Sequence, residues 1–243
     1  MTALRRIARL EHRLTRPNAS LAELDAAIGL ALEHQLASLA VSPWLVKPAA
    51  RQLARTPVRV ATVIGYPHGS QVAAVKAFEA SEALEHGATQ LDFVLNAGAL
   101  VSGDDEAVLL DMLAVVEMAR SALATSGVIL QAGPLGEELI RRACRLAARA
   151  GADYVVTSDG DEPAPLTIER VRFLHTVAGG QLEIKAAGVF TDLAQIVDAA
   201  EAGASRISAS FSAELAADSR AWLAASDRVP ATPPLADAGV AAG

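Results

Sequence analysis

The chain has 243 residues, of which 52% are hydrophobic and 20% charged, and its formal net charge is -7. This length suits one barrel-sized domain of about 250 residues. The acidic balance argues against a nucleic acid or a membrane surface as partner, because the phosphates of both repel it. A single cysteine excludes an intrachain disulfide. No run of 18 apolar residues and no secretory signal is found, so we expect a cytoplasmic protein.

Short apolar runs rich in valine and isoleucine recur along the chain. They are apolar at consecutive rather than alternate positions, which is typical of parallel strands covered on both faces. In chain order the predicted strands are 36–41, 58–64, 90–95, 128–131, 154–158, 182–187 and 206–209, with a less clear one near 7–12.

Helix-length segments lie between these runs. The predicted helices cover 70–86, 104–124, 136–150, 167–177 and 192–202. Gly87, Gly151 and Gly203 each follow a helix and precede an alanine and a strand, where a left-handed residue commonly ends a helix. Thr191 or Asp192 is expected to cap the start of the last of these helices.

Eight such units in this length predict a closed (β/α)8 TIM barrel, an α/β fold, in residues 1–225. An open doubly wound sheet is the alternative, but it usually needs fewer strands, and no G-x-G-x-x-G motif follows a first strand. The Ala-, Pro- and Gly-rich segment 226–243 has no periodicity and predicts a flexible tail. No linker divides the chain into two domains.

Two charged residues interrupt predicted strands. Asp92 must be paired or chemically active, because burying a lone carboxylate is costly. The chain has three lysines, and Lys47 and Lys76 fall in predicted helix or loop, where we expect them to be solvated. Lys185 is the one that a strand would point at the barrel centre. Asp92 and Lys185 therefore form a structural ion pair, or they act as an amine nucleophile and its acid/base partner.

The remaining residues with reactive side chains give weaker signals. Cys144 falls in a predicted helix and is expected to pack in the core. The five histidines are scattered without metal-ligand spacing. We expect neither a metal site nor a cofactor.

Four segments resemble the deoxyribose-phosphate aldolase family. ATVIGYPHG at 61–69 with VKAFEA at 75–80 is similar to that family's third strand and following helix. LDFVLN at 91–96 is similar to its fourth strand, AGADYVVTS at 150–158 to its sixth, and IKAAG at 184–188 to its seventh. The match keeps a consistent order from about Leu10 to Ser212.

The resemblance implies a class I aldolase, in which a lysine amine attacks an aldehyde and the resulting Schiff base serves as an electron sink. Asp92 matches the family's aspartate, and Lys185 matches a second lysine that tunes the nucleophile. The nucleophilic lysine itself should stand at Val156. Because valine has no nucleophilic group, the usual covalent mechanism is lost at this position.

The resemblance also implies substrate-binding positions at the ends of strands six to eight. These are Thr157, Ser158, Gly188, Ser208 and Ser210. In that family the phosphate-binding ends of strands seven and eight are glycine-rich, so that backbone N–H groups can approach the anion.

Several positions depart from the family pattern at this end. In strands seven and eight, two expected glycines are Val189 and Ser208, an arginine is Thr191, and a second serine is Phe211. An acid and hydroxyl pair in the first strand becomes Glu11 and Arg13, a strand-five glutamate becomes Gln131, and an asparagine before a proline becomes Ser42.

Three hypotheses for function follow. In the first, Lys185 is the only candidate amine for reversible aldol cleavage of a small sugar, sugar phosphate or aldehyde. In the second, the chain is a catalytically inactive paralogue that binds a ligand or a partner protein. In the third, Asp92 acts as a base without a Schiff base. The resemblance also suggests a homodimer.

Overall fold

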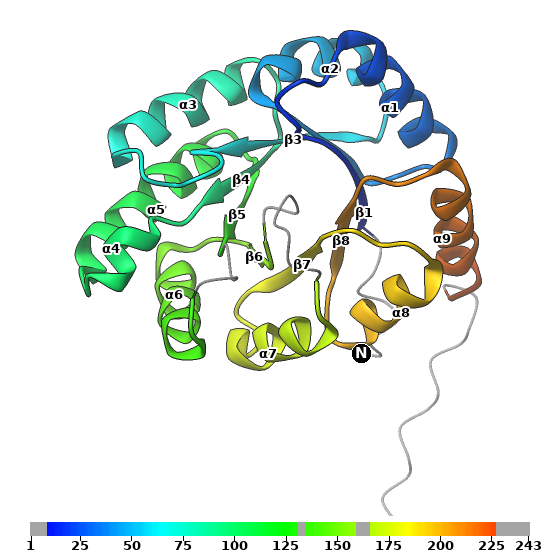
Figure 1. The fold of residues 1–243 in the computed structure, drawn as a ribbon. Helices are drawn as coiled ribbons and strands as arrows, with labels where there is room; N and C mark the ends of the chain where they lie inside the picture. The colour runs from blue at the N-terminus through cyan, green and yellow to red at the C-terminus, as the bar shows by residue number, and fades with distance from the viewer. Residues whose placement is uncertain (1–8, 131–134, 159–165, 227–243) are drawn as a thin grey trace, which may run out of the picture.

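The computed structural model describes residues 9–130, 135–158 and 166–226. In this part of the chain, eight strands form a closed barrel in the order β1 to β8, and every neighbouring pair is parallel (Figure 1). The strands are β1 (Arg9–Leu14), β2 (Ser38–Val41), β3 (Arg59–Ile64), β4 (Gln90–Val94), β5 (Thr125–Ile129), β6 (Tyr154–Val156), β7 (Glu183–Ala187) and β8 (Arg206–Ala209). The predicted (β/α)8 barrel is confirmed.

Helices surround this barrel on the outside (Figure 1). They are α1 (Leu21–Glu33), α2 (Val46–Leu53), α3 (Ala73–Glu85), α4 (Ala97–Val101), α5 (Asp105–Ser121), α6 (Glu137–Ala150), α7 (Ile168–Ala178), α8 (Leu193–Glu201) and α9 (Ala213–Ser226), with a 3-10 turn, η2 (Pro43–Leu45), before α2. Within the described residues, no helix combines the length and apolarity needed to cross a membrane. The predicted tail lies outside the described residues from 227 onward.

The predicted helix ends are correct in several places. Gly87, Gly151 and Gly203 all have positive φ, and Gly151 is the left-handed C-cap of α6. At the start of α8, the Asp192 side chain accepts a hydrogen bond from the backbone N–H of Gln195. These caps fix the residues at which the outer helices begin and end.

The fifth strand differs from its prediction. It begins at Thr125 rather than at residue 128. The residues Thr125, Ser126 and Gly127 lack the apolar pattern of a strand, yet they pair with β4, and the Ser126 N–H donates to the Asp153 carboxylate at 2.8 Å. Tertiary pairing therefore extends this strand beyond its local propensity.

The expectation that Lys76 is solvated is wrong. Its side chain on α3 is fully buried, and its ammonium donates to Asp111 on α5 at 2.6 Å and to the backbone oxygen of Val94 at 2.8 Å. The pair joins two neighbouring outer helices to the end of β4. Cys144 packs in the core as expected, and burial raises the pKa of its thiol to about 12.

The barrel lumen has two layers of different character. Toward the carboxyl ends of the strands an apolar cluster fills it, made of Val63, Val94, Ile129, Val156 and Ala187 with Tyr154. Toward the amino ends lie the charged and polar side chains of the candidate site. The candidate site therefore lies in the half of the lumen near the amino ends of the strands, and the apolar cluster separates it from the carboxyl ends.

Candidate active site in the barrel lumen

Four strands send functional side chains into the lumen. Glu11 comes from β1, Asp92 from β4, Tyr154 from β6 and Lys185 from β7, and each is at most 5% exposed. The neighbours of Asp92 and Lys185 along their strands are buried apolar residues of the core between the barrel and the outer helices. The alternation of a strand therefore leaves these four side chains no other environment than the lumen.

Lys185 is the centre of the site. Its Nζ lies 2.7 Å from Oδ2 of Asp92, and 3.0 and 3.1 Å from the two carboxylate oxygens of Glu11. The predicted pairing of Asp92 with Lys185 thus exists, and Glu11 joins it. One buried ammonium contacts two buried carboxylates, so the attraction among them offsets part of the cost of removing all three from water.

Polar side chains near the amino ends of the strands hold Glu11 in place. Ser38 donates to its carboxylate at 2.8 Å and Gln90 at 2.5 Å, and Arg206 in turn donates to Gln90 at 3.2 Å. Sequence reasoning missed these partners. The available signal was that Ser38, Gln90 and Arg206 are polar residues that each begin an apolar strand.

Tyr154 and Gly127 form a second feature that the sequence did not reveal. The Tyr154 hydroxyl donates to Oδ1 of Asp92 at 2.5 Å. Gly127 pairs with both residues on the strand between them, and a Cβ there would lie 1.9 Å from the tyrosine ring. Glycine therefore opens the space through which Tyr154 reaches Asp92, a use of strand glycine that allows close approach.

The two carboxylates have opposite protonation preferences. Burial raises the pKa of Asp92; the Lys185 charge opposes this rise and the Glu11 charge adds to it. Burial would also raise the pKa of Glu11, but the Lys185 charge and the hydrogen bonds from Lys185, Ser38 and Ser208 lower it. Pairs of groups whose pKa values are separated in this way are suited to divide acid and base roles.

Val156 lies in the apolar layer of the lumen and is 2% exposed. It pairs in register with Lys185 on the neighbouring strand, so their Cα atoms are about 5 Å apart. A side chain at 156 therefore lies beside the candidate amine. Valine at this place covers the amine on the side of the carboxyl ends.

The predicted substrate-binding residues that follow β6 and β7 have structural partners. The Thr157 hydroxyl donates to the backbone oxygen of Ala187 at 3.1 Å and accepts from the N–H of Ala187 at 3.0 Å. Ser158 donates to the same oxygen at 3.2 Å. The N–H of Gly188 donates to the backbone oxygen of Ser208 at 3.2 Å. These groups link neighbouring strands at the carboxyl end.

Ser208 and Ser210 are placed at different levels. Ser208 pairs with Glu11 and hydrogen-bonds its carboxylate, so it belongs to the charged centre. Ser210 donates to the backbone oxygen of Arg13 at 3.1 Å and lines a cavity of about 240 Å³ at the carboxyl ends of β1 and β8. Arg13 and Arg16 also line that cavity. The structure brings Asp92, Lys185 and Ser208 together and keeps Ser210 apart.

His12 and Phe211 close the same end of the barrel. The backbone N–H of Phe211 donates to Nδ1 of His12 at 3.1 Å, and burial lowers the pKa of His12 to about 4. A neutral imidazole therefore accepts this N–H, which is then not available to an anion. Within the described residues, no group of three His, Cys, Asp or Glu side chains could hold a metal ion.

The fold and the lumen together define a (β/α)8 barrel built around a lysine and two carboxylates, a centre suited to carbonyl chemistry. The family model described as DeoC/LacD family aldolase matches residues 3–243, and the chain belongs to this family. The family expected from the sequence motifs is thereby confirmed, and an aldolase-like function follows.

Similar proteins support this assignment. The deoxyribose-phosphate aldolase of Shouchella clausii is 41% identical over 206 residues, covering 84% of this chain and 92% of the relative. Among solved structures, the aldolase QR15 superimposes with a TM-score of 0.80 at 32% identity, over 90% of this chain and 96% of that one. The tetrameric deoxyribose phosphate aldolase of Aeropyrum pernix has a TM-score of 0.80 at 28% identity, over 90% and 92%.

Proposed function

We propose that the protein catalyses reversible aldol cleavage of a small aldehyde or sugar phosphate through a Schiff base on Lys185. The observation that carries the proposal is the contact of one lumen amine with two carboxylates of opposite pKa shift. With valine at position 156, Lys185 is the remaining lysine in the lumen, since Lys47 and Lys76 belong to the outer helices α2 and α3.

The first step is removal of a proton from the ammonium, because only a neutral amine attacks a carbonyl. Asp92 lies 2.7 Å from Nζ, and its raised pKa makes it a better proton acceptor than an ordinary carboxylate. The amine then adds to the carbonyl carbon. Asp92 returns the proton to the departing hydroxyl, so water leaves and an iminium forms.

Glu11 has the complementary role. Its lowered pKa keeps it ionised, and it contacts the same nitrogen at 3.0 Å. The iminium carries the positive charge that the ammonium carried before, so Glu11 stabilises this charge throughout. The iminium draws in the electron pair of the bond between its α and β carbons. As Asp92, ionised again, accepts the proton of the β-hydroxyl, this bond breaks to give an enamine and a free aldehyde, and the reverse steps form it.

The substrate would approach from the carboxyl ends of the strands, where barrel enzymes bind their substrates. The cavity between β1 and β8 has two guanidinium groups, Arg13 and Arg16, which suit an anionic substituent. Lys185 is 1% exposed beneath Val156 and its apolar neighbours. The apolar layer must therefore open before the carbonyl reaches the amine.

Reductive trapping tests this proposal directly. Wild-type protein is treated with acetaldehyde or deoxyribose 5-phosphate and sodium borohydride, and the modified peptide is mapped by mass spectrometry. We expect one adduct on Lys185, none after Lys185→Met, and an unchanged adduct after Lys47→Met. An unmodified Lys185 across a panel of aldehydes, in protein that is folded by circular dichroism, would refute the proposal.

The apolar layer favours a second candidate function, a barrel that binds a ligand without turnover. Val156 and its neighbours fill the space in which a reacting carbonyl would lie. This candidate predicts no cleavage of deoxyribose 5-phosphate, and no activity in Val156→Lys, because the substrate end differs as well. Measurable cleavage by the wild type would rule it out.

A homodimer remains a prediction. On α3 and just before it, Val72, Val75 and Phe78 are 67%, 49% and 67% exposed. Their spacing of three residues places them on one face, and such exposed apolar groups often mark interaction surfaces. Analytical ultracentrifugation of wild type and Phe78→Ser would show whether this face holds two copies together.

A further inference from the structure

The amino ends of the strands enclose a second cavity, on the face opposite to the expected substrate entrance. It has a volume of about 190 Å³. Its lining comes from Arg9, Glu11, Ala37, Ser38, Pro57, Arg59, Gln90, Lys185 and Arg206. Five of these residues begin a strand of the barrel: Arg9, Ser38, Arg59, Gln90 and Arg206 are the first residues of β1, β2, β3, β4 and β8.

Positive charge predominates in this cavity, although the chain as a whole is acidic. Three arginines and Lys185 line it, against one lining carboxylate, Glu11. Glu11 is already bonded to Lys185, Ser38 and Gln90. Glu11 shares the Lys185 ammonium with Asp92, so the positive excess of this cavity rests on its three arginines.

Glu183 compensates only part of this excess. It pairs with Arg9 at 3.1 Å and with Arg206 at 2.8 Å, so one carboxylate serves two guanidinium groups. In the described ranges, no carboxylate lies within ion-pair distance of Arg59. Guanidinium groups that lie close together repel one another, and an anion between them offsets this repulsion.

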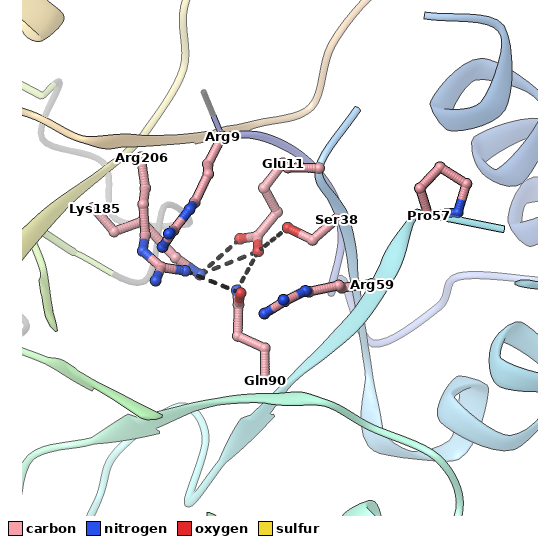
Figure 2. A pocket seen from close by; sticks show the side chains of 9 residues that line it. Arg9, Glu11, Ser38, Pro57, Arg59, Gln90, Lys185 and Arg206 are labelled. Carbon is pink, nitrogen blue, oxygen red and sulfur yellow. Dashed lines mark hydrogen bonds and ion pairs between the residues drawn. The ribbon is translucent and has the colours of Figure 1, made fainter. Parts of the chain in front are cut away.

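The arrangement of the side chains suits a small oxyanion. Figure 2 shows Arg9 and Arg206 on one side and Arg59 on the other, all extending toward Glu11 and Gln90 in the middle. Arg206 is 5% exposed, and its ring contact with Tyr154 at 4.2 Å fixes its position. One guanidinium group can donate two parallel hydrogen bonds to two oxygens of a phosphate. Since a water molecule occupies about 30 Å³, the cavity has room for a phosphate group with a few carbon atoms.

We infer that this cavity is a second binding site, for phosphate or a small phosphate ester, held by Arg9, Arg59 and Arg206. Arg206 bonds Gln90, which bonds Glu11, so an anion there would also be connected to the charged centre of the lumen. The inference concerns binding alone and does not depend on the proposed cleavage reaction.

Calorimetric titration with inorganic phosphate, at constant ionic strength in sodium chloride, tests the site. We expect saturable binding that Arg59→Gln weakens at least tenfold and Arg9→Gln weakens several-fold. Arg51→Gln is the matched control, since Arg51 is an exposed arginine of α2 outside the cavity lining, and it should bind as the wild type does. Arg59 is exposed, so its substitution should leave the fold intact.

Two outcomes would overturn the inference. One is phosphate binding that is the same in wild type, Arg59→Gln and Arg9→Gln, or not saturable, which would mean general ionic association. The other is binding that Arg16→Gln abolishes and Arg59→Gln preserves, since Arg16 lines the cavity at the carboxyl ends. That result would place the anion on the opposite face of the barrel.

Discussion

Asp92 and Glu11 contact the same ammonium from two strands, yet they differ in how readily they take a proton. Lys185 Nζ lies 2.7 Å from Asp92 and 3.0 Å from Glu11. Burial raises the pKa of Asp92, whereas the lysine charge and several hydrogen bonds lower the pKa of Glu11. Protonating Asp92 therefore costs less free energy than protonating Glu11. Replacing each carboxylate by its neutral amide tests this difference.

We expect Glu11→Gln to destabilise the protein more than Asp92→Asn. Removing the carboxylate that stays ionised leaves a buried ammonium poorly compensated, which costs about 3–5 kcal/mol. Asparagine resembles the neutral form that Asp92 approaches more easily, so its cost should be about 1–2 kcal/mol. Urea unfolding at pH 7 measures both. An equal or reversed order would contradict the division of roles between the two carboxylates.

The sign of the pH dependence follows from the same shifts. Glu11 has a lowered folded-state pKa, so the stability it contributes is present above its unfolded pKa and lost as pH falls through the folded value. Asp92 has a raised folded-state pKa, so its ionisation costs stability as pH rises above its unfolded pKa. Glu11→Gln should therefore reduce the loss of stability on acidification, and Asp92→Asn should not.

Gly127→Ala should disturb the site without touching a charged residue. The added Cβ would overlap the Tyr154 ring, so the ring must move and release Asp92. Overpacking of this kind costs about 1–3 kcal/mol. Urea unfolding gives the cost, and a change in the near-UV circular dichroism of the aromatic residues reports the displacement of the ring.

A matched control for Gly127→Ala is Gly136→Ala. At that glycine, which caps the start of α6, an added Cβ meets no atom within 4 Å. A stability loss at Gly127 no greater than at Gly136 would mean that the close approach of Tyr154 is not required.

The two lysines outside the lumen should respond very differently to removal of their charge. Lys76→Met leaves Asp111 buried without its partner and should cost about 3–5 kcal/mol. Lys47→Met changes an exposed residue and should alter the free energy of unfolding by no more than about 0.5 kcal/mol. Chemical denaturation of both variants checks this contrast. Similar losses for the two would show that the Lys76 pair adds no stability.

The fold could be predicted from the sequence because its signals are local. Consecutive apolar residues indicate strands covered on both faces, and glycines such as Gly151 mark helix ends. Asp92 and Lys185 were predictable for the same reason, since a charged side chain inside an apolar strand must be paired or take part in chemistry. The start of β5 was not, because Thr125 becomes strand only through pairing with β4.

The contacts of the site were less predictable because they depend on register across the barrel. Tyr154 reaches Asp92 only because Gly127 stands between them on β5, and local sequence does not encode that alignment. Lys76 was misjudged because helical lysines are mostly solvated, and its partner Asp111 lies 35 residues away on another helix. Both cases require the packing of elements and not only their existence.

His12 should make stability fall as the pH is lowered from about 6.5 to about 4. Burial lowers its folded-state pKa to about 4 from an ordinary value of 6.5. In this window the unfolded chain binds a proton that the folded chain does not, so stability rises with pH. A difference of this size corresponds to about 3 kcal/mol.

His12→Gln keeps an acceptor for the Phe211 N–H but cannot titrate, so its stability should vary less across the window. His68→Gln, at an exposed histidine, is the control and should follow the wild type. If urea unfolding at several pH values gave parallel curves for His12→Gln and the wild type, burial of His12 would not be the cause of the acid sensitivity.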